Sequence, residues 1–201
     1  MNHKSKSHTA SGLGKFFIIG LRRSGTSILR KLISQSPGVK NIQFEPHDLL
    51  YAVSILKIPR FKGTAYPTSV VRAFEALPKW SGAKFALNPG IDALDWIWLS
   101  KTFPNARFIF ITRNTNSNFE SYKKADAKTL RGVITNNIYK PFHGHINTGF
   151  NSFHKNNKAI STIINYDSML KDVDMEMSKV WKLLKIKSPG SLKHMIKQPK
   201  N

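Results

Sequence analysis

The hydrophobic residues of this chain form short unbroken runs, and stripes at helical spacing follow them. The first run, Phe16–Ile19, predicts a buried strand. A turn bounded by Gly20 and Gly25 comes next, and the apolar spacing after it predicts a helix that opens at Thr26 and Ser27. The apolar stripe of this helix consists of Ile28, Leu29, Leu32 and Ile33.

The order of strand, turn and helix occurs twice more. Residues 84–87 predict a short strand, and a helix is expected from about Asp92. Residues 107–112 (RFIFIT) form the strongest apolar run, and a helix capped by Asn116 or Ser117 should follow. Three such repeats predict an α/β fold of three layers (α/β/α), in which helices cover both faces of a central parallel sheet, as in the P-loop NTPases.

The rest of the chain is less regular. Residues 57–81 are rich in proline and glycine and predict an irregular insertion with a short helix near 70–76. Residues 123–158 are polar and asparagine-rich, with few periodic apolar positions, whereas a final helix is expected at about Asp172–Leu184. We therefore expect one domain over residues 15–188, a disordered basic tail at 1–14 and a second basic tail at 189–201.

Charge and composition narrow the classes of function. The 201 residues include 32 Lys+Arg against 11 Asp+Glu, a formal net charge of +21, which indicates an acidic partner: a nucleotide, nucleic acid, anionic glycan or anionic lipid. The absence of cysteine excludes disulfides, thiol catalysis and cysteine-ligated metals, and the histidines show no paired spacing, so no metal site is expected. Without an apolar run for a membrane span or a signal peptide, a cytoplasmic location is expected.

The first glycine turn is a candidate anion site. Backbone N–H groups at a helix start are unpaired, and the helix dipole adds partial positive charge there. The spacing from Gly20 to Ser27 is nearly that of the nucleotide P-loop, but Thr26 stands where that loop has its lysine. This disfavours hydrolysis of ATP or GTP, and the cations lie within the turn instead, at Arg22 and Arg23. The alternative is a glycine-rich turn without a ligand.

Two further groups of residues are expected at the same edge of the sheet. Arg113 ends the RFIFIT strand and Ser121 lies eight residues later in the next helix, so both are candidates to bind one phosphate. Glu45 precedes Pro46 and is a candidate general base, with His47 as the second choice. The alternative for Glu45 and His47 is a role as solvated loop residues.

Together these motifs give the chain a family resemblance. The loop LRRSGTS, followed later by Arg113 and Ser121, resembles the sulfotransferases that use 3′-phosphoadenosine 5′-phosphosulfate (PAPS), over roughly residues 16–186. The segments FALNPG and INYDSML are weaker matches, and the second implies that Tyr166 stacks on adenine, although a core tyrosine fits equally well. The residues that the resemblance assigns to the donor are Arg22, Arg23, Ser24, Gly25, Thr26, Ser27, Arg113, Ser121 and Tyr166.

The resemblance also implies the chemistry. A sulfuryl group would pass from PAPS to a hydroxyl or amine, with Arg23 stabilising the bridging oxygen and Glu45, ahead of His47, as the base. No metal is required. Residues 123–158 would cap the acceptor side, where a carbohydrate or anionic glycan is a fitting substrate; a solvated lysine-rich surface is the alternative.

The sequence departs from the family pattern in several places. Arg22 replaces a loop proline, and Asn114-Thr115 replaces Asp-Pro after the second arginine. Asn88 stands near the place of an expected lysine, so that Lys84 or Arg22 would supply that charge.

Two other classes remain as alternatives. A P-loop kinase or NTPase requires a lysine at Thr26 and an acidic magnesium ligand at a strand end, which RFIFITRN does not offer. A nonenzymatic nucleic-acid binder would explain the net charge, but it should present a basic face rather than arginines at strand ends. Specific recognition of nucleic acid is therefore not expected.

Overall fold

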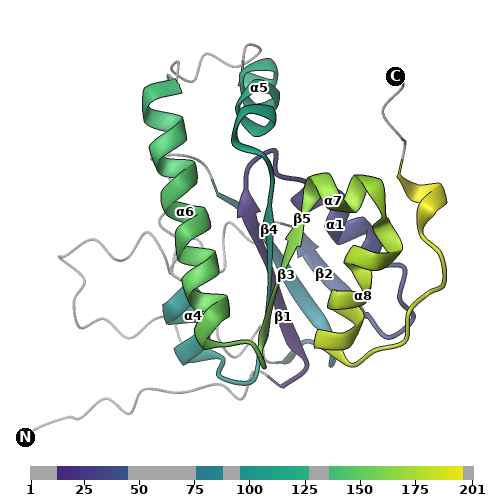
Figure 1. Ribbon diagram of the computed structural model, residues 1–201. Helices are drawn as coiled ribbons and strands as arrows, with labels where there is room; N and C mark the ends of the chain where they lie inside the picture. Colours follow the sequence, from purple (N-terminus) through teal and green to yellow (C-terminus); the bar gives the residue numbers. More distant parts are fainter. Residues whose placement is uncertain (1–12, 45–75, 88–95, 127–135, 197–201) are drawn as a thin grey trace, which may run out of the picture.

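The central feature of the fold is a five-stranded sheet with the strand order β2-β3-β1-β4-β5 and parallel pairing throughout. The structure is a computed structural model that describes residues 13–44, 76–87, 96–126 and 136–196 (Figure 1). The strands are β1 (Lys15–Leu21), β2 (Asn41–Phe44), β3 (Ser81–Leu87), β4 (Arg107–Thr112) and β5 (Ser161–Asn165).

Helices cover both faces of the sheet, which confirms the predicted three-layer α/β/α architecture (Figure 1). One face carries α4 (Trp96–Thr102) and α6 (Asn136–Asn156), and the other carries α1 (Thr26–Ile33), α7 (Tyr166–Lys171) and α8 (Val173–Leu184). Helix α5 (Thr115–Asp126) stands beyond the carboxyl end of β4 (Figure 1). In the part of the chain that is described, no helix has both the length and the apolar character needed to cross a membrane.

The middle strand, β1, is buried along its whole length because both of its faces are covered. Phe17, Ile19 and Leu21 pack toward α4 and α6, while Phe16 and Ile18 pack toward α1 and α8. The chain proceeds from β1 to β2 and β3 on one side of the sheet and to β4 and β5 on the other. The turn after β1 therefore lies at the switch point of the sheet, where α/β folds bind their ligands.

Helix α6 is the largest difference from the sequence prediction, which saw few periodic apolar positions in this region. It runs for 21 residues. Its buried stripe alternates steps of four and three residues and includes a histidine between aromatic and aliphatic side chains. The stripe consists of Tyr139, His143, Ile146, Phe150 and Phe153. The histidine interrupts the apolar pattern, so the helical period was not visible in hydrophobicity alone.

The element boundaries also differ in part. The cap of α5 was predicted wrongly: Asn114 caps the helix, because its Oδ1 accepts hydrogen bonds from the backbone N–H groups of Asn116 (3.0 Å) and Ser117 (3.2 Å). The final helix matches its prediction, with Asp172 as the N-cap. The helix expected from about Asp92 is found as α4 (Trp96–Thr102) in its described part, and residues 92–95 lie outside the description. Of the short helix predicted near 70–76, only residue 76 is described.

The described chain continues past residue 188 into the segment expected to be a basic tail, up to residue 196. A short 3₁₀ helix, η3 (Lys193–Met195), follows α8, and Leu192 and Ile196 on either side of it are buried in the same core cluster as residues of α1 and α8. Asp174 fixes this segment, because its carboxylate accepts hydrogen bonds from Leu192 N (2.8 Å) and the Ser191 hydroxyl (2.7 Å).

Candidate functional site

The turn between β1 and α1 has an unusual backbone conformation. Arg23 and Gly25 both adopt left-handed conformations, with φ of 69° and 99°. The N–H group of Ser24 donates to the carbonyl of Leu21 at 3.0 Å and closes the turn. A non-glycine residue such as Arg23 adopts this conformation at a cost of about 1–2 kcal/mol, and such strain is concentrated at functional sites.

The start of α1 is not capped by a side chain. Gly25 is the N-cap residue and provides no side-chain hydrogen bond, and the first turn of the helix contains no acidic residue. The first helical hydrogen bond runs from Leu29 N to Gly25 O at 3.0 Å. The helix start therefore offers N–H groups and the positive end of the helix dipole to an anion.

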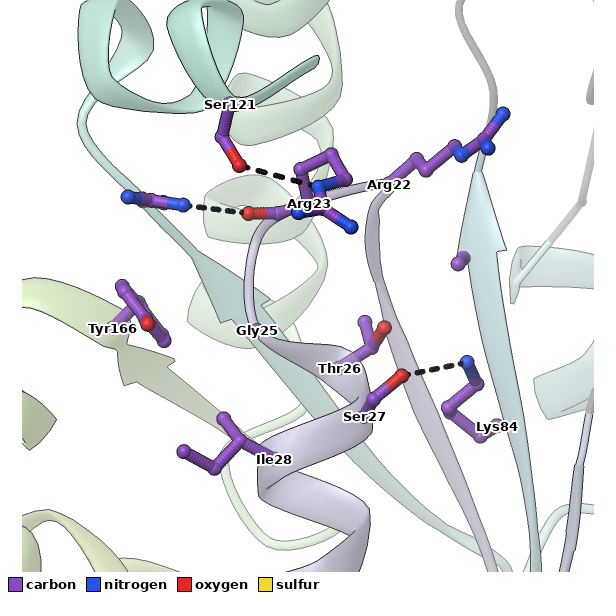
Figure 2. A pocket seen from close by; sticks show the side chains of 11 residues that line it. Arg22, Arg23, Gly25, Thr26, Ser27, Ile28, Lys84, Ser121 and Tyr166 are labelled. Atoms are coloured by element: carbon purple, nitrogen blue, oxygen red, sulfur yellow. Dashed lines mark hydrogen bonds between the residues drawn. The ribbon is translucent and has the colours of Figure 1, made fainter. Parts of the chain in front are cut away.

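A cavity of about 430 Å³ opens at this helix start (Figure 2), within the size range of sites for small-molecule ligands. Among the described residues that line it, four carry a positive charge and none is a carboxylate. The lining residues are Arg22, Arg23, Gly25, Thr26, Ser27, Ile28, Lys84, Ala86, Arg113, Ser121 and Tyr166. This composition fits an anionic ligand with more than one charged group.

Arg113 connects the predicted phosphate-binding pair, Arg113 and Ser121, to the first loop. Its Nη1 donates to the backbone carbonyl of Arg23 at 3.0 Å, and its guanidinium lies 4.7 Å from the centre of the Tyr166 ring. Arg23 in turn donates from Nε to the Ser121 hydroxyl at 3.2 Å (Figure 2). Within the described part of the chain, the buried Nε of Arg113 has no hydrogen-bond partner. A ligand oxygen would satisfy this group.

The turn that carries Arg113 is held from the neighbouring helix α7. The backbone N–H group of Asn114 donates to Asp167 Oδ2 at 2.8 Å. Because Asn114 also caps α5 through its side chain, this residue fixes both the strand end and the helix start. The Asn114-Thr115 pair thus forms a well-anchored turn even though the family pattern has Asp-Pro at this place.

A buried histidine holds the same turn from α6. The Nδ1 atom of His143 lies 3.0 Å from the Thr115 hydroxyl and 3.2 Å from the Asn147 amide nitrogen. Since that amide nitrogen can only donate, Nδ1 is the acceptor and the ring proton is on Nε2. Burial lowers the pKa of His143, and a hydrogen bond to the Arg113 backbone opposes this effect. His143 could not be predicted as part of the site, since nothing in the local sequence pattern relates it to Arg113.

The two remaining cations approach the cavity differently. Lys84, on β3, is 1% exposed, and its Nζ donates to the Ser27 hydroxyl at 3.4 Å. The side chain of Arg22 instead extends away from Thr26 and Ser27 (Figure 2), and its backbone N–H group donates to Leu87 O at 2.8 Å.

The structure brings most of the predicted donor residues to this one cavity. The exception is Ser24, whose side chain is 1% exposed and does not line the cavity. Glu45 and His47 lie outside the described residues. Ile28 and Ala86, which form an apolar part of the cavity wall, were not among the predicted site residues, and Lys84 was predicted only as a substitute charge. The signal for Lys84 was a lysine inside a predicted apolar strand.

Replacement of Gly25 by alanine should destabilise the protein by about 1–3 kcal/mol, because the new side chain would require a left-handed backbone. An added Cβ would also lie 2.3 Å from Tyr166 Cδ2. Urea denaturation followed by circular dichroism measures this change. The matched control is Gly144→Ala, at an exposed position in α6 where an added Cβ meets no atom within 4 Å. This control should be neutral or stabilising. Equal effects of the two substitutions would mean that the left-handed backbone of Gly25 and its contact with Tyr166 do not require glycine.

Comparisons with known proteins identify the fold. No protein-family model and no curated protein sequence matches the chain. Among solved structures, a sulfotransferase from Alicyclobacillus acidocaldarius aligns with a TM-score of 0.56 and 16% identity, over 86% of this chain and 81% of the other.

Two further structures were solved with PAP (adenosine 3′,5′-bisphosphate) bound. Mouse sulfotransferase SULT7A1 complexed with PAP aligns with a TM-score of 0.56 and 19% identity, over 90% of this chain but only 61% of the mouse chain. Retinol dehydratase in complex with retinol and PAP aligns with a TM-score of 0.52 and 13% identity, over 95% of this chain and 68% of the other. The chain therefore has the sulfotransferase fold.

Proposed function

We propose that this protein is a sulfotransferase that moves a sulfuryl group from PAPS to a hydroxyl or amine of an acceptor. The observation that carries the proposal is the cavity at the uncapped start of α1, into which Arg23 and Arg113 bring charge from two different strand ends. The sulfotransferase fold and the PAP bound in two structures of that fold support the same conclusion.

The two ends of the donor would bind at different parts of the cavity. Thr26 and Ser27, with the backbone N–H groups of the helix start, suit the 5′-phosphosulfate. Arg113 and Ser121 suit the 3′-phosphate, because both line the cavity. The unpaired Nε of Arg113 and the Ser121 hydroxyl can both donate hydrogen bonds to phosphate oxygens. Tyr166, whose ring lies beside Arg113, offers an aromatic face for adenine.

The transfer itself requires charge stabilisation and one proton acceptor. The acceptor oxygen or nitrogen forms a bond to sulfur while the bond from sulfur to the 5′-phosphate oxygen breaks, and the phosphate leaves with the electron pair. Arg23 stabilises the charge on that oxygen. The proton of the acceptor passes to a base, for which Glu45 is our first candidate and His47 our second.

The other functional classes fit the cavity less well. A nucleotide kinase uses a loop lysine and a carboxylate that holds magnesium, but Thr26 occupies the position of the lysine and no described lining residue is acidic. A nonenzymatic nucleic-acid binder needs cations spread over an open face. Here four of the cations line one cavity.

Isothermal titration calorimetry with adenosine 3′,5′-bisphosphate (PAP) tests the donor assignment. We expect clear binding of this ligand and at least about tenfold weaker binding of ATP with magnesium, because ATP has no 3′-phosphate for Arg113 to bind. Equal or tighter binding of ATP with magnesium would instead favour the kinase class.

The acceptor class requires a separate experiment. We infer a carbohydrate acceptor, and an anionic glycan in particular, from the net charge of +21. Incubation with radiolabelled PAPS and a panel of acidic glycans, neutral glycans, lipids and small alcohols should give the strongest label transfer to the acidic glycans. Preferential labelling of small alcohols or lipids would contradict this inference.

A further inference from the structure

Helix α6 has a histidine within its buried stripe. His143 is 2% exposed and stands between Tyr139 and Ile146 in a row of otherwise aromatic and aliphatic side chains. An aliphatic residue would continue this stripe without loss of hydration, whereas a buried imidazole needs hydrogen-bond partners for its nitrogens. The place of these partners therefore indicates what His143 contributes to the protein.

His143 contacts the start of α5. Its Nδ1 lies 3.0 Å from the hydroxyl of Thr115, which is the first residue of that helix. The Asn147 amide nitrogen, one turn further along α6, lies 3.2 Å from the same atom and fixes it as the acceptor. Burial lowers the pKa of His143, although a hydrogen bond to the Arg113 backbone opposes this effect. The ring is therefore neutral at pH 7, and Nδ1 keeps its lone pair for the Thr115 hydroxyl.

The start of α5 carries both side chains that suit the 3′-phosphate. Arg113 directly follows β4 and lies two residues before Thr115, and Ser121 lies within α5. Both line the cavity. A shift of Thr115 would therefore move the Arg113 backbone and the Ser121 hydroxyl together.

The other contacts of this turn come from the opposite side of the sheet. Arg113 donates to the first loop, and the backbone N–H group of Asn114 donates to α7. The contact between Thr115 and His143 is made by α6, which covers the other face. The turn between β4 and α5 is thus held from both faces of the sheet.

We propose that His143 is a positioning residue for the 3′-phosphate of the donor: through Thr115 it holds Arg113 and Ser121 in place at the cavity. This inference rests on the proposed sulfotransferase function. His143 is not one of the described residues that line the cavity, so it acts on the turn and not on the ligand. Its ring keeps the same proton throughout, and it takes no part in the transfer of the sulfuryl group.

Two ligands that differ in the 3′-phosphate separate this role from a general effect on stability. In calorimetry, His143→Leu should weaken binding of adenosine 3′,5′-bisphosphate about three- to tenfold, the usual range for one hydrogen bond. AMP, which lacks the 3′-phosphate, should bind as it does to the wild type. His143→Asn should restore the affinity for the bisphosphate, because its amide oxygen is bonded to Cγ, as Nδ1 is, and accepts the same hydrogen bond.

Thr115→Val removes the same hydrogen bond from its other side. It is the milder change, because Thr115 is only half-buried, and it decides the question if His143→Leu is not stably folded. It should show the same selective loss of bisphosphate affinity. The double variant should lose little more than either single variant, because both substitutions remove one shared interaction.

The matched control is His154→Leu. His154 also lies on α6, and its Nδ1 also lies 3.0 Å from a hydroxyl, that of Ser161. Ser161 is the first residue of β5, at the end of the sheet away from the cavity. This control should leave the affinities for both ligands unchanged. Thermal denaturation of every variant establishes that it is folded.

The results distinguish a failure of this inference from a failure of the proposed function. Equal losses for the bisphosphate and AMP in His143→Leu would show a general disturbance and overturn the role of His143. Unchanged affinities in His143→Leu and Thr115→Val would overturn it too, as would a loss in His143→Asn as large as that in His143→Leu. A wild type that binds the bisphosphate no more tightly than AMP would overturn the sulfotransferase proposal, and His143 would then have no 3′-phosphate to position.

Discussion

Replacement of Glu45 by glutamine is expected to lower the rate of sulfuryl transfer about 10²–10⁴-fold, the usual contribution of a general base. The affinity for adenosine 3′,5′-bisphosphate should not change, because glutamine keeps the size of the side chain and removes only its basic oxygen. Glu45 is the residue after β2, which ends at Phe44, and Phe44 pairs with Lys84 at the side of the cavity. Transfer of label from PAPS to the best acceptor of the panel measures the rate.

The control for this substitution is His47→Gln, which removes the second candidate. If Glu45 is the base, His47→Gln should retain most of the activity. The opposite result would assign the base to His47. Loss of activity in neither variant would contradict both assignments and place the base elsewhere, while loss of bisphosphate affinity in Glu45→Gln would indicate a structural role.

Replacement of Arg113 by alanine should weaken binding of adenosine 3′,5′-bisphosphate about 10²–10³-fold, since it removes two charge-assisted hydrogen bonds to the 3′-phosphate. AMP lacks this phosphate, so its affinity should be nearly the same in the variant and the wild type. Calorimetry with both ligands completes a double-mutant cycle that isolates the interaction between the guanidinium and the 3′-phosphate.

Arg107→Ala is a suitable control, because Arg107 starts the same strand at the end away from the cavity. It should have little effect on either ligand. Arg113 also donates to the Arg23 carbonyl, so its removal can disturb the first loop. Equal losses for the bisphosphate and AMP would mean that this structural contact, and not binding of the 3′-phosphate, explains the affinity.

The sheet and the first loop were predictable from sequence because their signals are local. A parallel strand buried on both faces is a continuous apolar run, and RFIFIT and KFFIIGL, the runs of β4 and β1, are such runs. The crossover rules for parallel sheets limit the possible strand orders, but they do not select the observed order, which places β1 between β3 and β4. The three-layer architecture could therefore be predicted, although the register between strands could not.

The features that were missed depend on contacts between distant residues. His143 interrupts the stripe of α6, and its partners are Thr115 and the Arg113 backbone, about 30 residues earlier in the chain. The direction in which a side chain points also depends on residues far away in the sequence. Whether Ser24 or Lys84 faces the cavity, for example, depends on how α1 packs on β1 and β3. The sequence places Lys84 at the start of a predicted apolar strand, but only the packing places its amine beside Ser27.

The two hydrogen bonds that join the halves of the cavity span much of the chain. Arg113 and Arg23 are 90 residues apart, and Arg23 and Ser121 are 98 residues apart. A ligand held between them contacts the first strand–helix unit and the fourth strand at once, so neither part can unfold without releasing it. Ligand binding therefore couples the unfolding of the two parts. Saturating ligand raises the free energy of global unfolding, and not only that of opening one loop.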